Sequence, residues 1–183
     1  MTNTKALTID NAGEATGTLE AIQQKIGMVP NIYATMAHSP TTLQAFLGFG
    51  EALAKGALST KIREQIALTV AGENSCDYCA SAHTAIARGT GVDSDEAANN
   101  LAGEASDSRT AAILGFAKAV VRKRGLLDEG ELDRIRFAGV SDAEIVEILA
   151  VVAQNLFTNY FNHIAGTDID FPLVRTSQNR RAA

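Results

Sequence analysis

Apolar residues recur at helical spacing along most of the chain. Leu43, Phe46 and Leu47 are an example, in a helix expected to begin at Pro40 or Thr41 and to end near Gly56. The same spacing, bounded by capping residues and glycines, predicts further helices over 18–26, 30–36, 59–73, 76–88, 92–101, 106–124, 128–137 and 142–164. No segment shows the two-residue period of a strand. The pattern predicts an all-α, single-domain helical bundle.

The two ends of the chain are expected to differ from this domain. Residues 1–17 are polar and weakly periodic, so we interpret them as a partly ordered lead-in. The helical domain is assigned to residues 18–172, and residues 173–183, with Arg175, Arg180 and Arg181, to a C-terminal tail. A chain of 183 residues is long enough for one such domain with a sizeable core.

A weak internal repeat suggests that the bundle contains a duplicated helical unit. Residues 47–58 are similar to 114–127, and residues 70–74 are similar to 151–155. This alignment matches the two cysteines with Phe157 and Tyr160, so the second copy would have lost its thiols. Chance similarity between two alanine-rich amphipathic helices is the competing explanation.

Composition excludes some classes of partner. The net charge of −5 argues against nucleic acid or an anionic membrane as the main partner. There is no apolar run of about 18 residues and no secretory segment, so we expect a soluble, cytoplasmic protein. Two cysteines at Cys-x-x-Cys spacing in that compartment indicate redox or metal chemistry rather than a structural disulfide.

The two cysteines and one histidine share a helix face. Ser75 is expected to cap a helix over 76–88, on which Cys76, Cys79 and His83 lie within about 60° of one another. Cys76 would fall in the first turn, where the helix dipole lowers a thiol pKa. Cys79 has His83 one turn further on, and that imidazole can accept the thiol proton. Both sulfurs therefore have a reason to be reactive.

Glu64 is the other candidate for acid–base chemistry. It lies in the preceding helix among Ala67, Leu68 and Ala71, so its carboxylate needs a partner. An ion pair with Arg63 or another cation is the structural explanation. A proton relay to His83 or to a cysteine is the functional one.

Together these residues resemble a known redox signature. Glu64, Cys76 twelve residues later, Cys79, and His83 four residues after Cys79 are similar to the motif of the alkylhydroperoxidase D-like branch of the carboxymuconolactone decarboxylase family. The resemblance extends through the stretches 37–40 and 159–172, and covers roughly 28–172. One departure is that better-known members carry a histidine between the cysteines, where this chain has Asp77 and Tyr78.

The resemblance implies a thiol-dependent peroxidase. Cys79 would attack an organic hydroperoxide or hydrogen peroxide, and Cys76 would then form a disulfide with it, while His83 and Glu64 relay the proton. Helix-dipole physics alone would instead favour Cys76 as the more acidic thiol. An external dithiol or disulfide reductase would reset the pair, and no metal or other cofactor is expected. The resemblance also implies a homo-oligomer, a trimer or a hexamer.

Other functions compete with this one. A carboxymuconolactone decarboxylase-like lyase would use His83 and Glu64 on a small lactone or keto acid, and a non-peroxidatic thiol–disulfide oxidoreductase would use only the thiols. A zinc site is disfavoured because three ligands on one helix surround a tetrahedral ion poorly. Tyr78 and His163 are candidate pocket residues, although His163 is also explained by the C-terminus of its helix.

Overall fold

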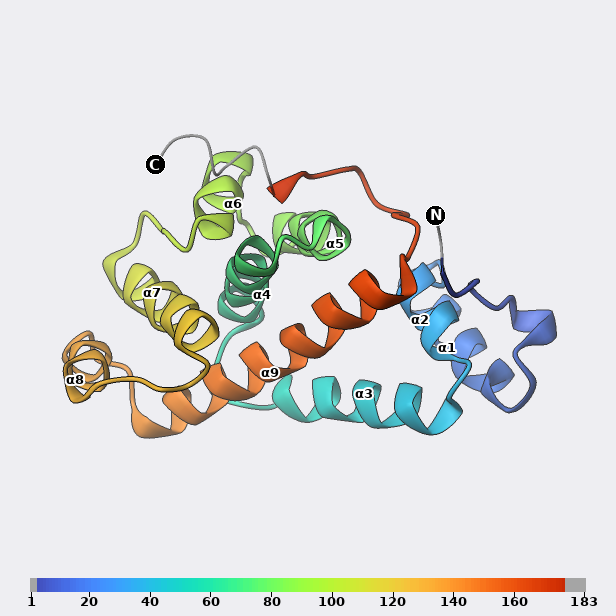
Figure 1. Ribbon diagram of the computed structural model, residues 1–183, viewed down its shortest axis with the longest axis horizontal. Helices are drawn as coiled ribbons and strands as arrows, with labels where there is room; N and C mark the ends of the chain where they lie inside the picture. The colour runs from blue at the N-terminus through green and yellow to red at the C-terminus, as the bar shows by residue number, and fades with distance from the viewer. Residues whose placement is uncertain (1–2, 177–183) are drawn as a thin grey trace.

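The computed structural model describes residues 3–176, and all regular structure in that part of the chain is helical, as predicted (Figure 1). Within this range, two short 3₁₀ turns, η1 (Ile9–Asn11) and η2 (Gly13–Ala15), precede nine α-helices. The α-helices are α1 (Thr16–Ile26), α2 (Asn31–Met36), α3 (Pro40–Leu53), α4 (Thr60–Asn74), α5 (Asp77–Arg88), α6 (Ser94–Leu101), α7 (Ser108–Lys123), α8 (Glu129–Phe137) and α9 (Asp142–Ala165).

Helix α4 lies at the centre of the molecule. It packs against α5, α6, α7 and α9, and Figure 1 shows it enclosed by these helices while α3 runs beside the long α9. Seven consecutive residues of α4, 65–71, are buried. A helix buried on all sides has no polar face, which explains why the apolar pattern of this segment covers nearly its whole circumference.

The core consists of two clusters that α4 separates. Leu68 and Ala71 belong to a cluster shared with α1, α2, α3, α5 and α6, which also contains both cysteines. Ile66 and Val70 belong to a second cluster shared with α7, α8 and α9. The reactive thiols therefore sit in the first of two apolar interiors, next to the N-terminal helices.

Helix boundaries follow their capping residues, with one correction. Ser59 and Ser141 cap α4 and α9, and Ser141 forms a capping box with Glu144. Ser75 was expected to cap α5, but it is the left-handed C-terminal residue of α4, with φ of 59°. Cys76 is the N-cap of α5 instead, and its sulfur accepts a hydrogen bond from the Cys79 N–H at 3.3 Å.

Both described ends of the chain pack against the domain. Residues 3–15, expected to be a lead-in, form the two 3₁₀ turns and bury Ala12 and Ala15 in the first cluster. At the other end, Thr176 donates from its backbone N–H and its hydroxyl to Asp77 Oδ1, at 2.9 and 2.8 Å. Residues 177–183, with Arg180 and Arg181 of the expected tail, lie outside the described residues.

The segments of the suspected repeat differ in one respect. The first would comprise α3, α4 and α5, with a break between α4 and α5 at Ser75 and Cys76. The corresponding part of the second is the single uninterrupted helix α9. The duplication stays a hypothesis, but the break is specific to the copy that carries the thiols.

No helix within residues 3–176 is both long and apolar enough to cross a bilayer.

Candidate active site

A cavity of about 510 Å³ lies between the N-terminal helices and the thiol-bearing helix. This volume is in the range of small-molecule sites. Side chains from α1, α2, α3, α4, α5 and α9 line it, together with Phe171 near the C-terminus. Cys79, His83, Glu64 and Tyr78 are all among the lining residues. The cavity thus collects four of the predicted site residues.

The two cysteines are free, buried and adjacent. Cys79 lines the cavity, whereas Cys76, the N-cap of α5, is absent from its lining. The Cys-x-x-Cys spacing at a helix start brings the second residue's N–H onto the first residue's sulfur, which explains the 3.3 Å contact. One thiol is therefore accessible to a bound molecule, and the other is positioned behind it.

The two thiols differ in acidity. The Cys76 thiol donates to the Cys79 sulfur and is buried, and these two effects raise the pKa of Cys76 far above its ordinary value. The same hydrogen bond lowers the pKa of Cys79 against the effect of burial, and donors on α9 lower it further. The predicted fall in the Cys76 pKa is therefore wrong, because its backbone donor and the helix start are outweighed by the neighbouring sulfur.

Glu64 and His83 form a close pair across α4 and α5. Glu64 Oε2 lies 2.7 Å from His83 Nδ1, and both side chains are partly exposed to the cavity. An ionised carboxylate only accepts hydrogen bonds, so Nδ1 carries the hydrogen and Nε2 is left for proton exchange. Burial lowers the pKa of His83, but the negative charge of Glu64 and this hydrogen bond outweigh it, and the net pKa is raised.

Arg63, the alternative partner of Glu64, bonds elsewhere. Its guanidinium donates to the Leu58 carbonyl and, at 3.0 Å, to the hydroxyl of Thr60. Its interactions are with the start of its own helix, and the Glu64 carboxylate is free to engage His83.

Two contacts hold Tyr78 at the cavity wall. Its hydroxyl accepts the Ile32 N–H at 3.2 Å, and its ring meets that of Phe171 edge to face, with the centroids 5.8 Å apart. Burial raises the pKa of Tyr78, so the phenol remains protonated at neutral pH. Of the two residues between the cysteines, Tyr78 thus faces the cavity, and Asp77 instead anchors the C-terminal segment.

His163 lies outside the site. It is exposed in the last turn of α9 and is not among the residues that line the cavity. The interaction of an imidazole with a helix C-terminus accounts for its position.

Asparagine side chains on α9 are a part of the site that the sequence analysis did not assign. The Asn162 Nδ2 donates to the Cys79 sulfur at 3.2 Å, and Asn159, Thr158 and Asn155 share its buried face. These positions follow i, i+3, i+4 and i+7, so they form a polar stripe within a buried apolar helix. Such a stripe is a detectable signal, because buried polar groups need partners.

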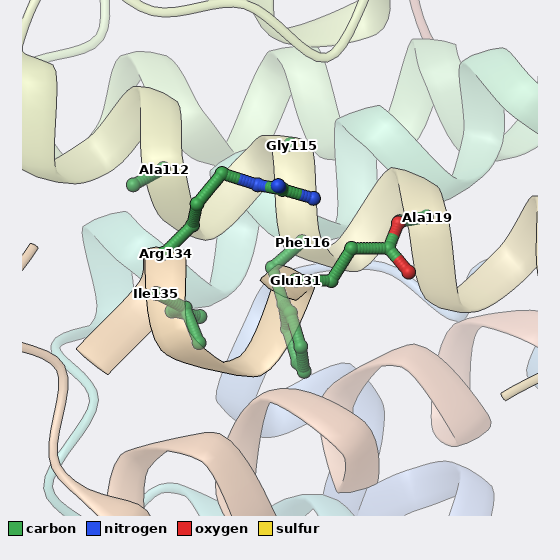
Figure 2. Close-up of a pocket in the computed structure, with 7 residues that line it drawn as sticks. All are labelled: Ala112, Gly115, Phe116, Ala119, Glu131, Arg134 and Ile135. Atoms are coloured by element: carbon green, nitrogen blue, oxygen red, sulfur yellow. The ribbon is translucent and has the colours of Figure 1, made fainter. Parts of the chain in front are cut away.

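A smaller hollow of about 300 Å³ lies between α7 and α8. Figure 2 shows Glu131 and Arg134 extending from α8 across the small side chains of α7. Glu131 pairs with Lys123 at 2.8 Å and closes the capping box of α8 through the Asp128 N–H, which explains it structurally. Within residues 3–176, no group of three or more acidic, histidine or cysteine side chains is arranged to hold a metal ion.

Residues 40–123 match the model of the carboxymuconolactone decarboxylase family. The resemblance predicted from the cysteine motif is therefore confirmed over this stretch. The matched residues run from the start of α3 to the end of α7, so they contain Glu64, both cysteines and His83 but exclude α9. No curated protein matches the chain.

Solved structures share the fold over most of the chain. An uncharacterized peroxidase-related protein from Ralstonia eutropha JMP134, with an alkylhydroperoxidase AhpD core, is 26% identical over 91% of this chain and 92% of its own, with a TM-score of 0.81. Another peroxidase-related protein, from Silicibacter sp. TM1040, is 28% identical over 85% and 84%, with a TM-score of 0.78. The debrominase Bmp8 is 25% identical over 91% of each chain, with a TM-score of 0.76. The family match and these structures indicate an enzyme of the alkylhydroperoxidase D or carboxymuconolactone decarboxylase type.

Proposed function

We propose that this chain is a thiol-dependent peroxidase in which Cys79 attacks the peroxide and Cys76 resolves the product. The observation that carries this proposal is the arrangement of the thiols. The Cys79 sulfur lines the cavity and has a lowered pKa, while the protonated Cys76 lies against it and away from the cavity. An attacking thiolate and a resolving thiol need these two environments.

The reaction then proceeds in two balanced steps. The Cys79 thiolate attacks the terminal oxygen of a hydroperoxide, the O–O bond breaks, and the alkoxide leaves as an alcohol after taking one proton. Cys79 is now a sulfenic acid. The Cys76 sulfur displaces its hydroxyl, which leaves as water, and a disulfide forms. The peroxide gains the two electrons that the dithiol loses.

Glu64 and His83 supply the proton of the first step. His83 lies one turn after Cys79 on α5, and both side chains line the same cavity. The pair with Glu64 favours the imidazolium, which can protonate the leaving alkoxide through Nε2. The proton is recovered from the Cys79 thiol when the next thiolate forms.

The cavity suits a substrate with an apolar group. Ile22, Ile32, Phe46 and Leu47 line it on the side of the N-terminal helices, and Phe171 lines it beside Tyr78. Burial of apolar surface against such walls contributes about 25 cal/mol per Å², which hydrogen peroxide cannot gain. Cumene hydroperoxide should therefore give a higher kcat/KM than hydrogen peroxide. The disulfide is returned to the dithiol by an external dithiol or disulfide reductase.

A peroxide-consumption assay tests the proposal. The reduced protein is supplied with cumene hydroperoxide and dithiothreitol, and turnover is compared with that of Cys79→Ser and Cys76→Ser. Cys79→Ser should lose the activity above the uncatalysed rate, and Cys76→Ser should turn over slowly. A Cys79→Ser variant as fast as the parent contradicts the proposal. If lactone turnover instead persists without both cysteines, the decarboxylase alternative gains support.

Reductive debromination is a second candidate, favoured by the 25% identity to the debrominase Bmp8 over 91% of each chain. Bmp8 has also been solved, as a cysteine-to-alanine variant, in complex with 2,3,4-tribromopyrrole. Replacing an aryl bromide by hydrogen consumes two electrons and releases bromide, and the dithiol of Cys76 and Cys79 can supply both electrons. Bromide release from 2,3,4-tribromopyrrole, with no turnover of hydroperoxide, would favour this activity.

A further inference from the structure

The buried polar face of α9 contains two kinds of side chain. Thr158 and Asn155 each donate within the helix, from the Thr158 hydroxyl to the Asn155 carbonyl at 3.0 Å and from the Asn155 Nδ2 to the Val151 carbonyl at 2.9 Å. Thr158 also lies close enough to Cys79 to lower the thiol pKa. Asn159 and Asn162, 0% and 5% exposed, direct their carboxamides toward other helices. Buried amides of this kind need partners beyond α9.

Asn162 finds its partner in the reactive sulfur. Its Nδ2, a neutral hydrogen-bond donor, donates to Cys79 Sγ at 3.2 Å. A hydrogen bond to a thiolate is charge-assisted and therefore stronger than one to a neutral thiol. The contact thus favours the ionised form of Cys79 over the protonated form.

Asn159 is oriented by a third asparagine. Its Oδ1 accepts from the Asn74 Nδ2 at 3.0 Å, and that same nitrogen also donates to the Val70 carbonyl at 3.0 Å. The oxygen of Asn159 is therefore committed to α4, and its Nδ2 faces away from Asn74. That nitrogen is buried and has no partner among the described residues, although it lies close enough to Cys79 to lower the thiol pKa.

We propose that the carboxamides of Asn159 and Asn162 select Cys79, rather than Cys76, as the attacking sulfur by donating hydrogen bonds to its thiolate. Asn162 provides the bond already formed, and the unpartnered Asn159 Nδ2 gains an acceptor when the sulfur carries its charge. Within residues 3–176, the hydrogen bond that Cys76 accepts comes from the Cys79 backbone N–H. The choice between the two thiols is thus made by α9, outside the segment that matches the family.

The titratable groups around the dithiol lie on α4, on α5 and beyond α9, and not on α9 itself. His83 lies on α5 and its charge acts on Cys76. Tyr78, also on α5, is buried near Cys79 and interacts with the half-buried Asp170 beyond α9. Glu64 on α4 acts through His83. The buried polar side chains that α9 turns to the sulfur, Thr158, Asn159 and Asn162, are all neutral. Their effect on the thiolate therefore does not vary with pH, which makes it separable from that of His83.

The inference rests on the proposed function only in taking Cys79 as the sulfur that attacks. Its test therefore measures the ionisation of the two thiols directly. Reduced protein is alkylated briefly with iodoacetamide over a range of pH, and peptide mass spectrometry reports the rate at each cysteine. In the parent, Cys79 should react first. Asn162→Leu removes one charge-assisted donor and should raise the Cys79 pKa by about one unit, a tenfold lower rate at pH values below that pKa.

Further variants keep the test decisive. Asn162→Asp places an anion beside the sulfur and should raise the pKa more than Asn162→Leu does, and Asn159→Leu should raise it as well. Asn99→Leu, an exposed asparagine on α6, is the matched control and should leave it unchanged. If the leucine variants do not fold, Asn162→Ser and Asn159→Ser replace them, because a shorter hydroxyl cannot reach the sulfur.

Two outcomes would overturn the inference: Cys76 reacting first in the parent, or a Cys79 pKa that stays at the parental value in the folded Asn162 and Asn159 variants. These results are distinct from a failure of the proposed function. A Cys79 pKa that depends on the asparagines, in a protein that does not consume peroxide, would contradict the proposed peroxidase function and support the inference. Peroxide turnover through Cys79, with a Cys79 pKa that the asparagine variants do not change, would support the proposed function and contradict the inference.

Discussion

Replacement of Glu64 by glutamine tests the acid–base pair with the smallest change of shape. Glu64→Gln keeps an oxygen that can accept from His83 Nδ1, now 2.7 Å from Glu64 Oε2, but removes the negative charge. A hydrogen bond to a charged group contributes about 1.5–3 kcal/mol. With 21% of the His83 and 15% of the Glu64 side chain exposed, we take the lower figure, which corresponds to about one pKa unit.

The assay is an NMR titration of carbon-13-labelled histidine. The parent should give a His83 pKa above its ordinary value of 6.5, and Glu64→Gln should lower it by about one unit. A smaller raising effect, from Cys76 and Asn155, remains in the variant. His38 and His163, both exposed, provide internal controls, and Glu129→Gln, exposed on α8, removes an equal charge elsewhere.

The same pair links stability to pH. Because the pKa of His83 is raised in the folded state, the pair's contribution is fully present below about pH 6.5 and is lost as the pH rises through the raised value. Urea unfolding should show Glu64→Gln less stable than the parent by about 1 kcal/mol more at pH 6 than at pH 9. A His83 pKa that is the same in the parent and in Glu64→Gln would refute the reasoning.

Three other predictions concern packing and assembly. Gly72→Ala should destabilise the fold by about 3 kcal/mol in urea unfolding, because a Cβ there would meet the Leu101 carbonyl oxygen at 1.9 Å, while Gly48→Ala, with nothing within 4 Å, should not destabilise it. Tyr78→Phe should lose about 1–2 kcal/mol, since the buried Ile32 N–H loses its acceptor; an unchanged midpoint would show that this N–H finds another partner. The homo-oligomer predicted from the sequence should sediment at three or six times 19.3 kDa, and a mass of 19.3 kDa would contradict it. Replacing Leu149 and Ile164, which are exposed on α9, by glutamate should lower that mass.

The sequence predicted what local chemistry determines. Ser59, Asp128 and Ser141 cap their helices through contacts three residues away, so the helix starts could be identified from the printed chain. The shared face of Cys79 and His83 follows from the helical period. Glu64 needed a partner because its neighbours are apolar, and the structure supplies it in His83.

Contacts between distant parts of the chain could not be predicted. The exchange of capping roles between Ser75 and Cys76 depends on how α4 ends, where the Cys76 N–H returns to the Ala71 carbonyl at 3.0 Å. The bond from Asn162 to Cys79 joins residues 83 positions apart. The predicted order of acidity of the two thiols reverses as a result, because the side-chain donors of α9 act on Cys79 and not on Cys76.

The measurement that most directly tests the central claim is intact-protein mass spectrometry of the reduced chain after stoichiometric cumene hydroperoxide. Attack by Cys79 and resolution by Cys76 predict a rapid loss of two hydrogens in the parent, and a sulfenic acid, trapped by dimedone, that accumulates in Cys76→Ser but not in Cys79→Ser. A dithiol that stays reduced in the presence of hydroperoxide, or a sulfenic acid that forms on Cys76, would contradict that claim.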